Sequence, residues 1–221
     1  TRSLCDWSSD VCSSDLKEYN INEKKKYEKM FYDKGQFLVG GADEVGRGPL
    51  AGPVVCAAVI MPSDCDLEGI DDSKKLSEKK REMLYDEIIK RAIAYDIEYV
   101  FQDVIDEINI LQATKLCMSK AINNLKVKPD VVLVDALSGL DTVCETRAIV
   151  HGDALSYNIG AASIIAKVSR DRYMKELDSQ YPQYGFERNK GYGTKEHMDA
   201  LRKYGPCEVH RKSFIGFLGD N

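Results

Sequence analysis

The chain has 221 residues, of which 43% are hydrophobic and 30% are charged, and its formal net charge is −5. This balance is typical of a single globular domain with a substantial core. Its apolar runs are too short to cross a membrane, and the net negative charge argues against binding polyanions by bulk attraction alone. Lys and Arg outnumber Asp and Glu in the C-terminal third. A nucleic-acid contact and an ordinary solvated surface both stay open there.

The first sixteen residues, TRSLCDWSSDVCSSDL, are rich in Ser, Asp and Cys and lack the pattern of a signal peptide. The stretch DWSSDVCSSDL resembles a translated sequencing adapter, so we expect residues 1–16 to be non-native, with a natural disordered tail as the alternative. The seven cysteines are scattered and form no CxxC pair. This favours reduced thiols in a cytoplasmic protein over a zinc site or disulfides. A monomer is the default expectation.

The hydrophobic pattern predicts alternating strands and helices after a short lead-in. Runs bounded by Gly and Pro predict strands at residues 37–45, 54–61, 95–101, 129–135 and 147–150. Helical spacing predicts helices at residues 17–34, 77–94, 103–126, 157–177 and 194–204. Ser77 is a candidate N-cap, and the third helix is expected to break near Asn109. The pattern predicts an α/β fold with a mixed sheet, in which residues 17–36 lead into a single domain at 37–221.

Acidic residues stand at the ends of predicted strands. They are Asp43 and Glu44 in the first strand, Asp135 at the end of the fourth and Asp153 after the fifth. Neighbouring strand ends bring such carboxylates together, where they raise one another's pKa unless a cation lies between them. Hard divalent cations such as Mg²⁺ or Mn²⁺ prefer oxygen ligands, and paired ions of this kind support phosphodiester cleavage. A single strand-end Asp is more often a turn or helix cap, but four favour a metal site.

Gly46, Arg47 and Gly48 follow the acidic pair directly. Glycine lacks a Cβ, so a ligand can approach the backbone closely at such positions. A tight hairpin turn explains the same residues nearly as well. The motif does not indicate a dinucleotide site, because a second strand follows it where a helix would be required.

Seven sequence blocks occur in one order along the chain from Lys17 onward. They are GADEVGRGPLAGPVV, DDSKKLS, VLVDA, HGDALSYNIGAASIIAKVSRD, YPQYGF, KGYGTKEH and HRKSF. Together they resemble bacterial ribonuclease HII. The related ribonuclease HIII typically carries GKG in place of GRG. The resemblance implies a ribonuclease H-like, five-stranded mixed sheet flanked by helices, with a small C-terminal helical portion. It also implies metal-dependent hydrolysis of RNA in RNA–DNA hybrids, and at single ribonucleotides in duplex DNA, leaving 5′-phosphate and 3′-hydroxyl ends.

The resemblance also implies roles for individual residues. The metal-binding, catalytic acids of the family match Asp43, Glu44, Asp135 and Asp153. Gly46, Arg47 and Gly48 match the loop that reads the ribose 2′-hydroxyl, the group that separates RNA from DNA. Tyr192 matches the tyrosine that packs on the sugar beside the scissile junction, although a core or turn tyrosine is the alternative.

One serine and four basic residues are expected to contact phosphate and position the duplex. The candidates are Ser73, Lys74 and Lys75 in one loop, and Lys167 and Arg170 on the helix after the fourth acid. Each set has a solvated face as its alternative, and for Arg170 the two interpretations weigh nearly the same. Asp171 is expected to orient a neighbour. His210 and Arg211 are expected either to hold phosphate or to cap the C-terminal helix.

Two other functions remain as alternatives. A non-catalytic nucleic-acid-binding relative is disfavoured, because four clustered negative charges would repel phosphate. A resolvase-like DNA nuclease of the same superfold is disfavoured by the GRG and KGY blocks.

Overall fold

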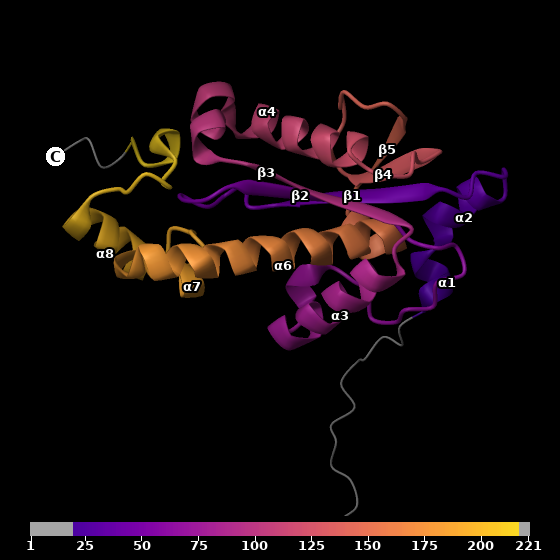
Figure 1. The fold of residues 1–221 in the computed structure, drawn as a ribbon, viewed down its shortest axis with the longest axis horizontal. Coiled ribbons are helices and arrows are strands. Elements are labelled where there is room, and N and C mark those ends of the chain that lie inside the picture. The colour runs from indigo at the N-terminus through magenta and orange to yellow at the C-terminus, as the bar shows by residue number, and fades with distance from the viewer. Residues whose placement is uncertain (1–19, 217–221) are drawn as a thin grey trace, which may run out of the picture.

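A computed structural model describes residues 20–216, which are arranged around one mixed sheet (Figure 1). Its strands are β1 (Val39–Val45), β2 (Val54–Ile60), β3 (Ala94–Val100), β4 (Val131–Asp135) and β5 (Glu145–Ile149). Their order across the sheet is β3-β2-β1-β4-β5. β2 pairs antiparallel with β1 and β3, whereas β4 pairs parallel with β1 and β5. The predicted hairpin and mixed sheet are confirmed, and the fifth strand begins at Glu145 instead of residue 147.

The helices match the predicted ones closely. The longer ones are α3 (Glu78–Arg91), α4 (Gln102–Asn123), α6 (Tyr157–Gln180) and α8 (Lys195–Tyr204). Ser77 caps α3 by accepting from the backbone N–H of Lys80, as predicted. Asn109 breaks α4 with a φ of 67°, and its side chain accepts from the N–H groups of Leu111 and Gln112. The break therefore restarts the helix with a new cap.

The other helical elements are short. The lead-in divides into α1 (Ile21–Lys24) and α2 (Lys26–Tyr32), where a single helix was expected; residues 17–19 of the predicted span, like residues 1–16, lie outside the described residues. Shorter turns that the periodicity did not reveal are η1 (Ser73–Lys75), α5 (Gly152–Leu155), η2 (Pro182–Tyr184), α7 (Phe186–Asn189) and η3 (Lys212–Phe214). They have too few residues to show a hydrophobic period.

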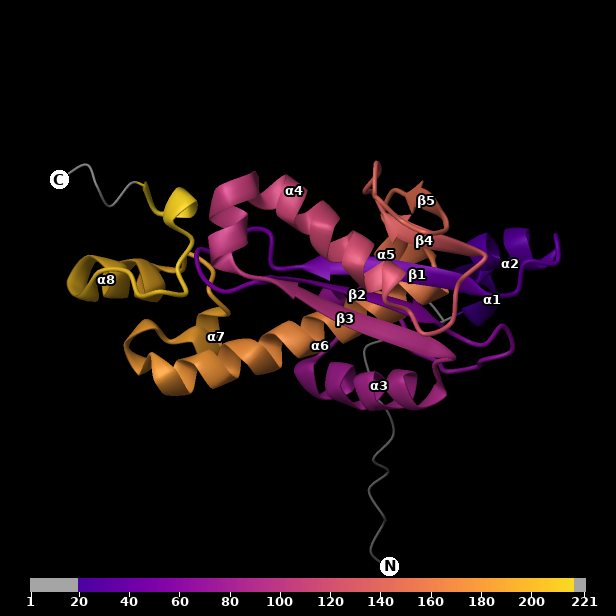
Figure 2. The same ribbon diagram turned by 45° about the horizontal axis from the view of Figure 1, so that its top comes forward.

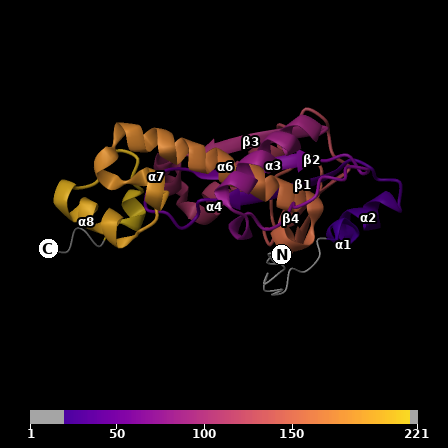
Figure 3. The same cartoon turned by 90° about the horizontal axis from the view of Figure 1, so that it is seen from below.

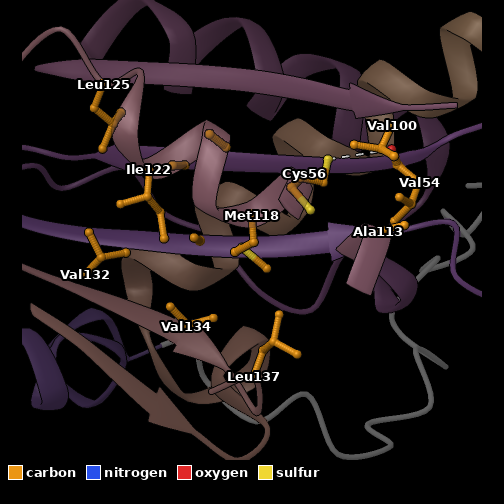
Figure 4. Close-up of a cluster of buried hydrophobic side chains, with 14 of the residues drawn as sticks. Val54, Cys56, Val100, Ala113, Met118, Ile122, Leu125, Val132, Val134 and Leu137 are labelled. Carbon is orange, nitrogen blue, oxygen red and sulfur yellow. Dashed lines mark hydrogen bonds between the residues drawn. The ribbon is translucent and has the colours of Figure 1, made fainter. Parts of the chain in front are cut away.

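One face of the sheet is covered by α4 (Figures 1 and 4). Every residue of β2 is buried, and alternate ones face α4, including Val54 and Cys56. They pack with Met118 and Ile122 of α4 and with Val132 of β4. A strand buried on both faces needs this continuous apolar sequence, which is why VVCAAVI shows no polar alternation.

The other face of the sheet is covered by α6 and α3 (Figure 2). Ala57 and Val59 of β2 pack there against Ile164 and Ile165. Gly41 permits the close approach of α6 to β1, since a Cβ at this position would lie 2.1 Å from the backbone carbon of Asn158. The start of α6 is thereby pressed against the strand that carries Asp43.

The two ends of the molecule are built differently (Figure 3). At one end, α7 and α8 pack on the end of α6 around Met174, Leu177 and Phe186, which is the expected C-terminal helical portion. At the other end, Glu28 of α2 is buried, and its carboxylate accepts from the Ser156 hydroxyl at 2.6 Å and from the N–H of Asn158 at 2.9 Å. The lead-in therefore caps the N-terminus of α6. No helix within residues 20–216 has the length and apolar character needed to span a membrane.

Candidate active site

The strand-end acids lie at one edge of the sheet. β1 and β4 run parallel with Ala42 opposite Val134, so Asp43 and Asp135 stand side by side at the next position. Both point away from the α4 face, because Ala42 and Val134 pack on it and neighbouring strand residues alternate. Asp153 joins them from the first turn of α5, where the N–H of Gly152 donates to Asp135 Oδ1 at 2.7 Å.

Electrostatics show that the four carboxyl groups share one environment. Burial raises the pKa of Asp43 well above its usual range, and the charges of Glu44 and Asp135 raise it further, while the Ser163 hydroxyl opposes this. Burial also raises the pKa of Glu44, with Arg47 opposing and Asp135 adding to the rise. The pKa of Asp153 is raised by burial and then by Asp72 and Asp135. Asp43, Glu44 and Asp153 are therefore each harder to ionise here than in water.

Two cations lie beside this group, Arg47 at Glu44 and Lys74 at Asp153. The Nζ of Lys74 lies 3.8 Å from Asp153 Oδ2. Partial burial disfavours its charge, but the carboxylates of Asp72, Asp153, Asp43 and Asp135 outweigh burial and raise the pKa of Lys74. The Lys74 side chain is largely exposed.

As they stand, no three His, Cys, Asp or Glu side chains among residues 20–216 are arranged to hold a metal ion. Alternation along β1 explains part of this, because Asp43 and Glu44 point to opposite faces of the strand. Asp135 and Asp153 each accept a backbone N–H through Oδ1. The structure thus gathers the four acids at one edge without closing them around a common point.

The turn after β1 places its glycines beside Tyr192. Gly46 has a φ of +91°, and a Cβ there would lie 2.3 Å from Arg170 Nε, so only glycine fits without strain. A Cβ on Gly48 would lie 3.7 Å from Tyr192 Cε1. The Tyr192 side chain is 43% exposed. Arg47 is half exposed and pairs with Glu44 at 3.3 Å. A ligand could therefore touch the turn and the tyrosine together.

Two buried arginines hold this turn from behind, and Arg170 is one of them. Arg170 donates to the carbonyls of Pro53 at 3.0 Å, Lys190 at 2.9 Å and Ala51 at 3.2 Å. Its side chain is fully buried. The expected phosphate contact for Arg170 is therefore corrected: the guanidinium ties the turn to the loop of Tyr192.

Arg211 is the second buried arginine. It donates to the carbonyls of Gly52 at 2.9 Å, Arg47 at 2.9 Å and Gly46 at 2.6 Å. Burial lowers the pKa of Arg170 to about 10, and burial and the charge of Arg170 lower that of Arg211 to about 9. Neither expected role of Arg211 is found, since it contacts backbone oxygens of the turn.

The remaining candidates from the sequence are placed as follows. Ser73 is buried and shares a hydrogen bond of 3.0 Å with Ser163, so its hydroxyl does not face substrate as expected. Lys75 is exposed and lies 3.8 Å from Asp71. Lys167 is mostly buried and pairs with Asp171 at 2.8 Å, which suits the expected orienting role of Asp171. A phosphate contact for Lys75 and Lys167 stays a prediction.

Residues that the sequence interpretation missed support the site from outside. Lys24 of α1 donates to Asp71 Oδ1 at 2.6 Å and to the carbonyl of Ala154 at 2.5 Å. It thereby links the Lys74 loop to α5, which carries Asp153. Ala136 and His151 adopt left-handed backbone conformations, with φ values of 44° and 58°. The sequence did not predict this, because neither residue type favours that conformation as glycine does. Strain of this kind, next to Asp135 and Gly152, is typical of functional sites.

Comparison with known proteins agrees with this geometry. The solved structure of ribonuclease H2 from Pyrococcus horikoshii matches with a TM-score of 0.70 and 27% identity, and the match covers 83% of this chain and 99% of that chain. The fold and its strand-end acids therefore define a ribonuclease H-type nuclease. The sequence model for the family described as Ribonuclease HII matches residues 40–216, and the chain belongs to this family.

Curated relatives support the assignment over most of their length. The chain is 54% identical over 198 residues to a protein named Ribonuclease HII from Caldicellulosiruptor bescii, covering 88% of this chain and 96% of that protein. It is 55% identical over 200 residues to the Ribonuclease HII of Bacillus subtilis, covering 90% and 77% respectively. The protein is therefore an endoribonuclease of the ribonuclease H type.

Proposed function

We propose that the protein cuts the RNA strand of RNA–DNA hybrids and cuts at single ribonucleotides embedded in duplex DNA, leaving 5′-phosphate and 3′-hydroxyl ends. The observation that carries the proposal is the juxtaposition of two sites on β1. The acid group begins at Asp43, and the glycine turn with Tyr192 beside it follows directly. A sugar read by the turn would lie next to a phosphate within reach of the acids.

We propose that Asp43, Glu44, Asp135 and Asp153 bind Mg²⁺ or Mn²⁺. The donor chemistry fits, because all four offer carboxylate oxygens and hard divalent cations prefer oxygen. The raised pKa values of Asp43, Glu44 and Asp153 fit as well, since burial and then mutual repulsion raise them and a cation would favour the charged form of each. The bound cation would activate water and stabilise the leaving oxygen of the phosphodiester. Binding would require side-chain rotation, above all by Glu44.

We propose that the backbone of Gly46, Arg47 and Gly48 reads the ribose 2′-hydroxyl while Tyr192 packs on the adjoining sugar. Two observations support this proposal. Tyr192 is exposed beside Gly48, and Gly46 and Gly48 lack a Cβ where the nucleic-acid strand must approach the backbone. Lys74 and Lys75 would contact phosphate, which positions the duplex without reading its sequence. Lys167 would need to exchange its Asp171 partner to do so.

The proposed setting is a cytoplasmic monomer. The cysteines among residues 20–216 are all free, which suits a reducing compartment. The sheet, its helices and the loops between them supply all of the proposed site residues from one chain, so a second subunit is not needed to complete the site.

The test is cleavage of a duplex that contains one ribonucleotide, with Mg²⁺ or Mn²⁺, beside an all-DNA duplex and a long RNA–DNA hybrid. We expect a cut on the 5′ side of the ribonucleotide, cuts in the hybrid and none in DNA. Binding without cleavage would favour a non-catalytic relative, and cleavage of the DNA control would favour a resolvase-like nuclease.

A further inference from the structure

Two buried histidines lie between the C-terminal segment and the loop of Tyr192. His197 is in the first turn of α8, and His210 follows that helix in the HRKSF block. Both are almost fully buried. Their rings contact one another and the rings of Tyr184 and Phe186. Two apolar side chains would fill this space at lower cost, so the polar pair requires an explanation.

The hydrogen bonds run in one direction through the pair. The N–H of Cys207 donates to His210 Nδ1 at 3.0 Å, the two Nε2 atoms lie 3.0 Å apart, and His197 Nδ1 lies 2.9 Å from the carbonyl of Tyr192. A carbonyl only accepts, so His197 carries its proton on Nδ1 and accepts at Nε2. His210 must then donate from Nε2 and accept at Nδ1, which the N–H of Cys207 satisfies.

The two ends of this hydrogen-bond chain, the N–H of Cys207 and the carbonyl of Tyr192, require the same proton positions on the two rings. The contact of 3.3 Å between His210 Nδ1 and the carbonyl of Cys207 then joins two acceptors and is not a bond in this state. Burial lowers the pKa of both rings, that of His210 to about 4, which keeps them neutral at physiological pH. Neutral rings with assigned tautomers form a fixed link from residue 207 to Tyr192.

The same C-terminal segment holds the glycine turn. His210 pairs with Ala51 in an isolated bridge, and the N–H of Arg211 donates to the carbonyl of Leu50 at 2.8 Å. The side chain of Arg211 binds the carbonyls of Gly46 and Arg47, as described above. Adjacent residues of one segment thus reach both parts of the proposed sugar-reading site.

We propose that His197 and His210 are positioning residues, which hold Tyr192 in register with the Gly46–Gly48 turn and so set the preference for a ribonucleotide junction. The inference rests on the proposed role of Tyr192. It explains the buried polar pair: the directed bonds specify one conformation of the tyrosine loop, whereas apolar rings of the same shape would only fill the space.

The test is a double-mutant cycle between His210→Phe and Tyr192→Ala. Phenylalanine keeps the ring packing with Tyr184 and removes both nitrogens, which leaves the Nε2 of His197 without its donor. The readout is the ratio of kcat/KM on a single-ribonucleotide duplex to kcat/KM on a long hybrid. We expect each single change to lower this ratio roughly tenfold, and the double variant to lower it no further than Tyr192→Ala alone.

A stability control separates positioning from folding. Leu201→Ala opens a cavity in the same apolar cluster without touching the hydrogen-bond chain, so it should lower the melting temperature and leave the ratio unchanged. Arg202→Ala, on the exposed face of α8, should change neither. In ¹⁵N spectra of the wild type, we expect His197 as the Nδ1–H tautomer and His210 as the Nε2–H tautomer.

Each failure has a distinct meaning. If the two changes multiply independently, or if Leu201→Ala shifts the ratio as much as His210→Phe, the positioning role is overturned while the proposed function stands. The opposite tautomers in the spectra would also overturn it. If Tyr192→Ala keeps the wild-type ratio, the proposed role of Tyr192 fails and the inference falls with it.

Discussion

Replacement of Arg211 by methionine should destabilise the protein more than any exposed charge could. The guanidinium makes three hydrogen bonds to carbonyls of the glycine turn, at 2.9, 2.9 and 2.6 Å. Methionine keeps much of the aliphatic packing but donates nothing, so Arg211→Met leaves three buried acceptors without this partner.

The size of the effect follows from two opposing terms. Hydrogen bonds from a charged donor contribute about 1.5 to 3 kcal/mol each, or roughly 4 to 9 kcal/mol for three. Burial of the guanidinium opposes this, as its lowered pKa of about 9 shows. We therefore expect a net loss of about 3 kcal/mol in the free energy of unfolding. For a domain of this size, the melting temperature would fall by roughly 6 to 12 °C.

Urea unfolding at neutral pH, followed by circular dichroism, measures this loss. The matched control is Arg47→Met in the same turn, since Arg47 is half exposed and pairs only with Glu44 at 3.3 Å. Such a pair contributes at most about 1 kcal/mol. If Arg211→Met proves as stable as Arg47→Met, the carbonyl bonds do not hold the turn and the structural reasoning is wrong.

Four further outcomes are expected. Asp135→Asn should abolish cleavage and leave hybrid binding nearly intact in a gel-shift assay, because the proposed cation site is lost and the phosphate contacts remain; retained turnover would remove Asp135 from that site. Gly46→Ala should lower stability by about 1 to 3 kcal/mol in urea unfolding, since its Cβ would meet Arg170 Nε at 2.3 Å and φ is +91°; a neutral result would contradict the turn geometry. Lys24→Met should raise the Mn²⁺ concentration needed for cleavage, because the bridge from Asp71 to the carbonyl of Ala154 is broken. An unchanged Mn²⁺ titration of cleavage would show that α5 does not need this support. As pH falls from about 6.5 towards 4, the wild type should lose more free energy of unfolding than His210→Phe does, because His210, with its pKa lowered to about 4, stays neutral in the folded protein while the unfolded chain takes up the proton; the same pH dependence in both proteins would contradict this.

The sheet could be predicted from the sequence because its cause is local. A run such as VVCAAVI is buried on both faces, and the Gly and Pro that bound it mark the turns. The break at Asn109 was predictable for the same reason, since Asn caps a helix through its own neighbours. Asp43 and Asp135 could be placed at one edge of the sheet once their strands were assigned, because adjacent strand ends meet there.

The roles of the buried arginines could not be predicted in this way. Arg170 and Arg211 look like phosphate ligands in a sequence, because an arginine near a nucleic-acid motif usually faces solvent. Their partners include carbonyls more than a hundred residues away in the sequence, at Pro53 and Gly46. Only the folded backbone decides which arginine points inward. The prediction for Ser73 failed for the same reason, since its partner Ser163 is 90 residues away in the sequence.

The two halves of the site have opposite electrostatic requirements, although only Val45 separates Glu44 from Gly46. Asp43 and Glu44 crowd negative charge, which burial and mutual repulsion disfavour. The glycine turn just beyond them exposes backbone carbonyls to two buried cations, Arg170 and Arg211. Because each arginine donates to backbone carbonyls, its charge stiffens the turn without pairing with the carboxylates. Neither arginine therefore competes with a cation for the acids, and both hold the surface that is proposed to read the sugar.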